Sequence, residues 1–353
     1  MNARNSMALC AALALMGAHN GYGESPAITR FSVESTNAAL DWSATTDRYI
    51  VATSDNLSTG QFEFVGPVLS TNHAAVTCVG APAFYRVREV FVVDLPASLR
   101  GLITDAILKK YDPPGSIYDI DLPSILALNA NGAGLSNASC LVWCSGLTNL
   151  SISTNQLHTL DLSRCANLGK LDCSVNQLTN LELSGSVTLS ILDCSSNRLA
   201  ALNVSGFPNL TELYCQFNFI QSLDVSGCPN LKYLFCFENE LTNLNTAGLA
   251  HLESLVCMNN PLRTLDVAGD ASMRVLVCDS TLLTNLNLAG CTNLSQVSCT
   301  YNQLSDLSSF VSNAAQGGLG SGDKLYLDSN PLSPYALTNQ IPYLTNLGVL
   351  VSY

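Results

Sequence analysis

The stretch LGKLDCSVNQL at residues 168–178 decides the fold, because it returns with the same spacing as LSILDCSSNRL at 189–199 and LTELYCQFNFI at 210–220. Eight such units follow one another every 21 residues without an insertion. They open at Leu147, Leu168, Leu189, Leu210, Leu231, Leu252, Met273 and Leu294. Self-similarity at a fixed period of this length predicts a solenoid, in which each unit forms one coil and buries its apolar face only against its neighbours.

Within each unit a cysteine and an asparagine recur at fixed positions. The cysteine row consists of Cys173, Cys194, Cys215, Cys236, Cys257, Cys278 and Cys299, with Ile152 in the first unit. The asparagine row consists of Asn155, Asn176, Asn197, Asn218, Asn239, Asn260 and Asn302, with Thr281 in the seventh unit. Because an amide can donate and accept at once, we interpret the asparagines as structural groups that satisfy the backbone where each coil turns. Thr281 should weaken this row locally.

The consensus L-x-x-L-x-C-x-x-N-x-L is the signature of a leucine-rich repeat. The inward cysteine, the 21-residue period and second halves such as LDLS at 160–163 and LDVS at 223–226 resemble internalin-like bacterial leucine-rich repeats of the cysteine-ladder type. The resemblance covers roughly residues 94–353. It implies a leucine-rich repeat solenoid with a parallel β-sheet on its concave face and a right-handed α/β-type coil with a short or irregular back face. It also implies an exported or cell-surface protein that binds proteins or glycans. The sequence carries no Leu-Pro-x-Thr-Gly sorting motif, so surface anchoring is not implied.

The chain divides into five expected segments. Residues 1–23 are a predicted signal peptide, because Arg4 precedes the short apolar run 7–16. Residues 24–93 alternate β-rich runs with turn residues, which predicts a small β-sandwich that resembles fibronectin-III modules. Residues 94–146 are predicted to form an N-terminal cap helix and a first irregular coil, 147–314 the eight repeats, and 315–353 a C-terminal cap. In that last cap we expect Ser333 as the N-cap of a helix whose apolar face holds Leu337, Ile341, Leu344 and Leu347.

The composition narrows the class of partner. Of 353 residues 47% are hydrophobic and only 12% are charged, and the formal net charge is −12. An acidic chain without clusters of Lys and Arg is a poor match for nucleic acid. The apolar run at 7–16 is too short to span a bilayer. We therefore expect an exported, monomeric protein with no transmembrane segment, no nucleic-acid partner and no cofactor.

The cysteine row occupies an inward position, so we expect buried free thiols. Some disulfides or a metal site are the alternatives. Thiols stacked in register on parallel strands point the same way, and no histidine joins them to complete a zinc site. Cys144 and Cys165 share another offset in adjacent coils and could pair with each other.

Side chains two, four and six residues after each opening leucine should point away from the core. In the fourth to sixth units these positions and the residues beside them become aromatic. We predict a ligand-binding surface on the concave face, formed by Glu212, Tyr214, Phe217, Tyr233, Phe235, Phe237, Glu238, Val256 and Met258. Exposed aromatic rings suit protein contacts and can also stack on sugars. The alternative is that the rings only pack on one another and stiffen the sheet.

The sequence contains no catalytic motif that we recognise, and we expect a non-catalytic protein without a metal site. The histidines stand alone, and the segment GGLGSGDK at 317–324 departs from a phosphate-binding loop. A carbohydrate-active enzyme on a parallel β-solenoid is the alternative function, since a row of acids and amides recurs on the back face. That row consists of Asp161, Glu182, Asn203, Asp224, Asn245, Asp266 and Asn287. A structural component of the cell envelope is a third possibility.

Overall fold

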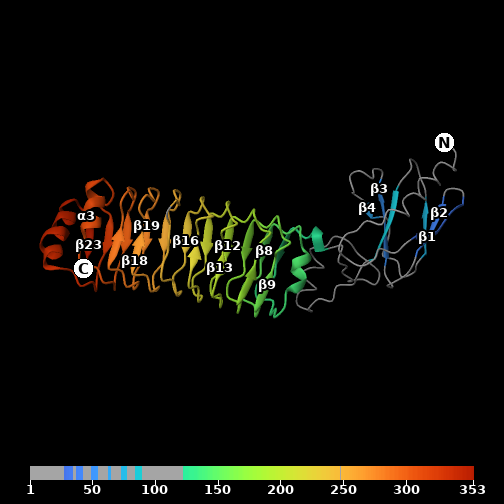
Figure 1. Ribbon diagram of the computed structural model, residues 1–353, viewed down its shortest axis with the longest axis horizontal. Helices are drawn as coiled ribbons and strands as arrows, with labels where there is room; N and C mark the ends of the chain where they lie inside the picture. Colours follow the sequence, from blue (N-terminus) through green and yellow to red (C-terminus); the bar gives the residue numbers. More distant parts are fainter. Residues whose placement is uncertain are drawn as a thin grey trace. The chain divides into compact units, whose positions relative to one another are not determined.

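The computed structural model describes residues 28–34, 37–42, 49–54, 63–64, 73–77, 84–89, 122–246 and 248–353 (Figure 1). These residues fall into two compact units, one N-terminal and one that contains the repeats. The predicted signal peptide at 1–23 and the predicted cap helix that begins at residue 94 lie outside the described residues.

The described backbone of the N-terminal unit forms two antiparallel three-stranded sheets. The first has the order β1-β2-β5 and the second β4-β3-β6. The strands are β1 (Ile28–Glu34), β2 (Asn37–Trp42), β3 (Tyr49–Ser54), β4 (Glu63–Phe64), β5 (His73–Thr77) and β6 (Phe84–Glu89). They coincide with the β-rich runs of the sequence.

The eight repeats supply eight strands of an eleven-stranded parallel sheet, one strand from each rung (Figure 1). One further strand precedes the repeats and two follow them. Partners in neighbouring rungs lie 21 residues apart along the eight repeats, as in Leu192 opposite Leu213 and Leu213 opposite Leu234. In order the strands are β7 (Ala127–Asn129), β8 (Asn149–Ser151), β10 (Lys170–Asp172), β12 (Ile191–Asp193), β14 (Glu212–Tyr214), β16 (Tyr233–Phe235), β17 (Ser254–Val256), β19 (Val275–Val277), β21 (Gln296–Ser298), β22 (Lys324–Tyr326) and β23 (Leu350–Ser352). We call the outward side of this sheet the long-sheet face.

The aliphatic rows of the repeat fill the interior of the coil. Leu150, Leu171, Leu192, Leu213, Leu234, Leu255, Leu276 and Val297 are all at most 1% exposed. Full burial of one such side chain contributes about 1.5–3 kcal/mol. A single rung has no second apolar layer of its own, so this contribution exists only when rungs stack.

The asparagine row satisfies the backbone between rungs, as the sequence predicted. The Nδ2 of Asn218 donates to the carbonyl oxygens of Cys194 in the preceding rung and Cys215 in its own, both at 3.1 Å. Its Oδ1 accepts from the backbone N–H of Leu199 at 2.9 Å. Thr281 cannot supply this amide, and the N–H of Leu262 turns instead to the carbonyl of Asn260. The row is therefore interrupted at Thr281, as expected.

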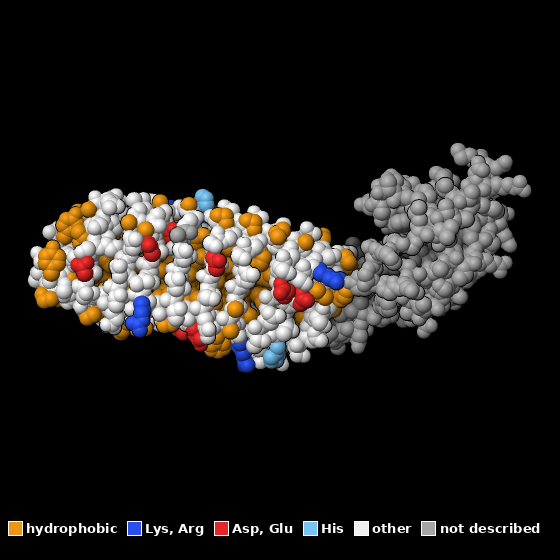
Figure 2. All heavy atoms as spheres, in the orientation of Figure 1, with side chains coloured by type: hydrophobic (Ala, Val, Ile, Leu, Met, Phe, Trp, Pro, Cys, Tyr) orange, Lys and Arg blue, Asp and Glu red, His pale blue; other side chains and the backbone are white. Residues whose placement is uncertain are grey.

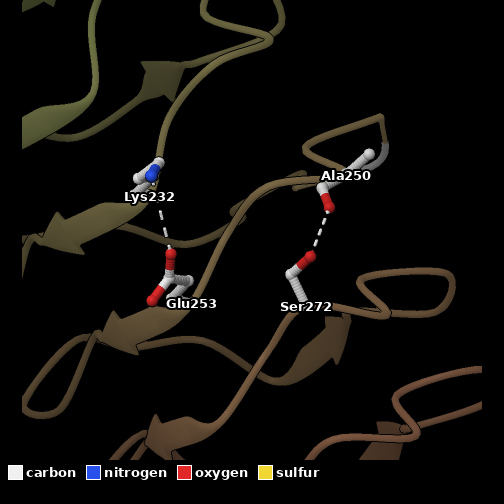
Figure 3. A network of polar contacts seen from close by, with 4 residues as sticks. All are labelled: Lys232, Ala250, Glu253 and Ser272. Carbon is white, nitrogen blue, oxygen red and sulfur yellow. Dashed lines mark hydrogen bonds and ion pairs between the residues drawn. The ribbon is translucent and has the colours of Figure 1, made fainter.

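A second set of polar contacts joins the rungs at the edge of the coil. The hydroxyl of Ser272 donates to the carbonyl of Ala250 at 2.8 Å, and Nζ of Lys232 lies 3.8 Å from a carboxylate oxygen of Glu253 (Figure 3). Side chains at the position of Ser272 make the same kind of bond to the preceding rung from Thr188, Asn209, Asn230 and Asn293. The sequence analysis did not single out this row.

The back of the coil carries a second set of short parallel strands. These are β9 (Thr159–Asp161), β11 (Asn180–Glu182), β13 (Leu202–Asn203), β15 (Leu223–Asp224), β18 (Thr264–Asp266) and β20 (Asn285–Asn287). We had expected a short or irregular back face of α/β type; the back is short, but in the repeats it is built from strands instead of helices. Each back strand is two or three residues long, and turns connect it to the next strand of the long sheet.

The cysteine row points inward and is free. All seven members are fully buried, and each is a free thiol in the structure. Burial raises the pKa of the Cys236 thiol to about 12 and that of Cys173 well above its ordinary value. Cys144 and Cys165 are likewise unpaired, and the Cys165 thiol donates to the Cys144 carbonyl instead.

The C-terminal segment contains α3 (Ser308–Ala315), the π-helical turn η4 (Ala336–Gln340) and α4 (Ile341–Asn346). Ser333 caps the last helical segment as predicted, because its Oγ accepts from the N–H of Ala336 at 3.1 Å. The predicted apolar face is only half right: Ile341 and Leu344 are buried, whereas Leu337 and Leu347 are about two-fifths exposed. A π-turn closes i→i+5 bonds and so shifts the phase of the residues that follow it. No helix in the described part of the chain is long and apolar enough to cross a membrane.

Candidate aromatic binding surface

The predicted binding residues all lie on the long-sheet face or in the turns that follow its strands. Their alternation with buried leucines fixes this direction, since successive side chains of a strand point to opposite faces. Strands β14 and β16 have the pattern half-buried, buried, half-buried. Glu212 and Tyr214 come from β14, Tyr233 and Phe235 from β16, and Val256 from β17. Phe217, Phe237, Glu238 and Met258 lie in the turns, where Phe217 and Glu238 are exposed and Phe237 and Met258 half-buried.

Aromatic rings from adjacent rungs meet edge to face. Tyr214 and Phe235 have ring centroids 5.3 Å apart at an interplanar angle of 85°. Phe217 and Phe237 are 5.1 Å apart at 77°. Such pairs contribute about 0.5–1.5 kcal/mol each beyond burial. The rings therefore do pack on one another, as the alternative interpretation expects. Phe217 nevertheless remains 50% exposed, and Tyr214, Phe235 and Phe237 are only half-buried.

Carboxylates border the rings on one side. The hydroxyl of Tyr214 donates to Glu212 at 2.9 Å. Burial, followed by this bond and the charge of Glu212, raises the pKa of Tyr214 to about 12. In the preceding rung Asp193 accepts from the N–H and hydroxyl of Ser195 at 3.0 and 2.6 Å. Burial raises the pKa of Asp193 above its ordinary value, although the Ser195 bonds oppose this shift.

The turns that present this surface have a left-handed backbone. Phe217 has φ of 57° and Glu238 of 54°, and the equivalent residues of the other rungs adopt the same region. This conformation costs a non-glycine residue about 1–2 kcal/mol, and it directs the side chain outward. Within the eight repeats, two exposed aromatic residues were not named in the sequence analysis: Phe219 is 53% and Tyr301 66% exposed. Phe219 lies directly after Asn218, so the asparagine row itself could have located it.

The acid and amide row of the back face has a structural task. Asp161 accepts from the N–H of Ser163 at 3.0 Å, and Asp224 from that of Ser226 at 2.9 Å. These bonds hold the turn that leaves each back strand, and they lower the pKa of both carboxyls. A general acid for glycoside cleavage requires a raised pKa, so these two carboxyls do not suit the role of that acid. In the part of the chain that the structure describes, no three His, Cys, Asp or Glu side chains are grouped to hold a metal ion.

The surface between these features is poor in charge. Figure 2 shows one face of the repeat region, where uncharged polar atoms and hydrophobic patches predominate and charged groups are few.

Stacked 21-residue rungs, inward leucine rows and an asparagine row define a leucine-rich repeat solenoid, and the inward thiols give it a cysteine ladder. Its structural neighbours are internalin-like and other leucine-rich repeat proteins. The functional domain of InlJ from Listeria monocytogenes, described as including a cysteine ladder, is similar at 28% identity and a TM-score of 0.51, over 65% of this chain and 54% of that one. A leucine-rich repeat protein of Leptospira interrogans is similar in fold at 23% identity and a TM-score of 0.57, over 66% of this chain and 62% of that one. This chain thus spans less than two thirds of either neighbour. No family model and no curated protein matches the sequence.

Proposed function

We propose that this protein is a secreted or cell-surface binding module that holds a protein or glycan partner on its long-sheet face and performs no catalysis. The observation that carries the proposal is the partly exposed cluster of five aromatic residues on this face, Tyr214, Phe217, Tyr233, Phe235 and Phe237. Large rings on a rigid sheet supply contact area at a low cost in side-chain entropy, which is why aromatic residues dominate binding hot spots. Contiguous apolar patches on a soluble surface commonly mark interaction sites.

The proposed segments around the repeats serve export and closure. Residues 1–23 would direct secretion, and 24–93 would fold as a sandwich, which the two three-stranded sheets support. Residues 94–146 and 315–353 would cap the ends of the core in 147–314. At the C-terminal end, the side chain of Gln340 supports this role, because it accepts from the N–H of Leu307 and donates to Asp306. N-terminal sequencing of the secreted chain tests whether residues 1–23 are removed as a signal peptide. Its mass in solution tests whether the protein is a monomer.

The test of the binding role is a triple substitution of Tyr233, Phe235 and Phe237 to Ser. Pull-down from the native environment should recover the partner with the wild type and lose it with the variant. The variant should stay folded, with a melting temperature lowered only by the loss of two ring pairs, about 1–3 kcal/mol together. Retention of the partner, or collapse of the fold, would favour the interpretation that the rings only stiffen the sheet. A glycan array identifies a sugar ligand, and a reducing-sugar assay with the same glycans tests the alternative of a carbohydrate-active enzyme.

A further inference from the structure

Charge is unevenly distributed over the long-sheet face. In the third to fifth repeats its outward positions and adjoining turn residues, 191–195, 212–217 and 233–238, include the acids Asp193, Glu212 and Glu238 but no Lys or Arg. Lys170 precedes them in the second repeat, opposite Ile191. Lys232 lies one residue before Tyr233, but it pairs with Glu253 at 3.8 Å. The aromatic cluster therefore borders a region with an excess of negative charge.

Each of two carboxylates in this region has an aromatic residue as its partner in the next rung. Asp193 lies opposite Tyr214, and Glu212 lies opposite Tyr233. Adjacent strands are about 4.7–4.9 Å apart, so a carboxylate and a ring face are within reach of one cation. A cation over a tyrosine ring is attracted by the π-electrons, and the attraction grows where water is excluded.

The same place has more hydrogen-bond acceptors than donors. The side-chain oxygen of Gln216, two residues after Tyr214, is buried and has no hydrogen-bond partner among the described residues. The hydroxyl of Tyr214 already donates its hydrogen bond to Glu212. A buried acceptor without a donor is costly, and rotation of this half-buried side chain toward an N–H of a partner would remove the cost.

We propose that the partner of this face is a protein segment that presents an Arg or Lys side chain next to an aromatic or aliphatic one. The cation lies against Tyr214 and Tyr233 between Asp193 and Glu212, and the apolar neighbour packs on Phe235 and Phe237. Arginine fits best, because its planar group offers several donors and stacks on rings. A neutral glycan would leave the carboxylates without a counter-charge. This inference rests on the proposed function, since it requires that the face binds a partner.

The experiment selects phage-displayed random peptides on the folded full chain, with the Tyr233, Phe235 and Phe237 to Ser variant as the counter-selection. The Kd of selected peptides is then measured on the double variant Asp193→Asn, Glu212→Gln. Both substitutions keep a side-chain oxygen for Ser195 and Tyr214. Glu182→Gln on the back face is the matched control, because it removes one charge and keeps an acceptor for the N–H of Ser184. Circular dichroism confirms that every variant is folded.

We expect the selected peptides to combine Arg or Lys with an adjacent apolar residue. Their Kd should weaken about tenfold on the double variant, with a smaller dependence on salt, and stay unchanged on Glu182→Gln. Peptides that need the aromatic residues but carry no excess of Arg or Lys, or whose Kd ignores the double variant, overturn this inference and leave the proposed function standing. Failure to enrich any peptide overturns it too, whereas the proposed function is decided by the pull-down.

Discussion

Asp270 is an ionisable group at a position that the repeat reserves for buried side chains, and its replacement by Asn should change how stability depends on pH. The equivalent residues of the other rungs are all buried, and Asp270 itself is 1% exposed; they are Cys165, Ser186, Phe207, Cys228, Leu249 and Cys291. Its carboxylate accepts a hydrogen bond from the hydroxyl of Thr246 at 3.0 Å. Burial raises the pKa of Asp270 from 3.8 to about 7.

The sign of the effect follows from proton linkage. Between about pH 4 and pH 7 the folded chain holds a proton on Asp270 that the unfolded chain has released, so the free energy of unfolding falls as pH rises through this window. At 1.36 kcal/mol per pKa unit the full loss is about 4 kcal/mol. Asp270→Asn keeps an oxygen for Thr246 and cannot ionise, so the variant should be more stable than the wild type at pH 7 and nearly equal to it at pH 4.

Urea unfolding followed by circular dichroism across this pH range measures the difference. Asp224→Asn is the control, because Asp224 is an exposed carboxyl that also belongs to a rung and also loses one charge. Its pKa is lowered by Ser226, so this substitution should leave the decline between pH 4 and 7 in place. Equal pH profiles for Asp270→Asn and the wild type would refute the reasoning.

Three further outcomes are expected. Val175→Asn should raise stability by about 1 kcal/mol in thermal unfolding, because Val175 is half exposed with φ of 52° and Asn tolerates this conformation better; a loss of stability would show that Val175 packs usefully. Asn218→Ala should cost about 3 kcal/mol in urea unfolding, since it leaves the carbonyls of two cysteines and one N–H without their shared partner, and a cost below about 0.5 kcal/mol would contradict the structural role. In the native chain Ellman's reagent should spare the cysteine row and react only slowly with the half-buried Cys140, because burial raises the pKa of that thiol to about 11. In denaturant it should give the same thiol count with and without prior reduction; a lower count before reduction would indicate disulfides.

Most of the fold could be predicted from the 21-residue period of the sequence. Each rung repeats one set of contacts, so a single rule about Leu171, Cys173 and Asn176 predicts the environment of every equivalent residue. The alternation of inward and outward side chains along each strand followed from the same repeat, and it predicted that Tyr214 and Phe235 point outward. Interior rows are predictable because a buried position tolerates few residue types. The same residue therefore recurs every 21 positions, and the repeat can be recognised in the sequence.

Features outside the interior were harder to predict. The edge row at Asn230 and Ser272 varies among Asn, Thr and Ser, because any side chain that can donate to the preceding carbonyl suffices there. The burial of Asp270 could not be predicted, because aspartate is normally a surface residue and its charge suggests an exposed position. The exposure of Leu337 and Leu347 depends on a π-turn, which apolar spacing does not reveal. Helix α3 is short, and its apolar residues, Phe310 among them, are too few to show a period.

The central claim is that the partner binds the long-sheet face, and site-directed photocrosslinking tests it most directly. A photoreactive phenylalanine analogue placed at Phe235 keeps an aromatic ring at the centre of the cluster, and the same analogue at Glu182 probes the back of the coil. Irradiation in the native environment should give a discrete adduct from position 235 and none from position 182. Adducts from position 182 alone, or equal labelling from both positions, would contradict the account.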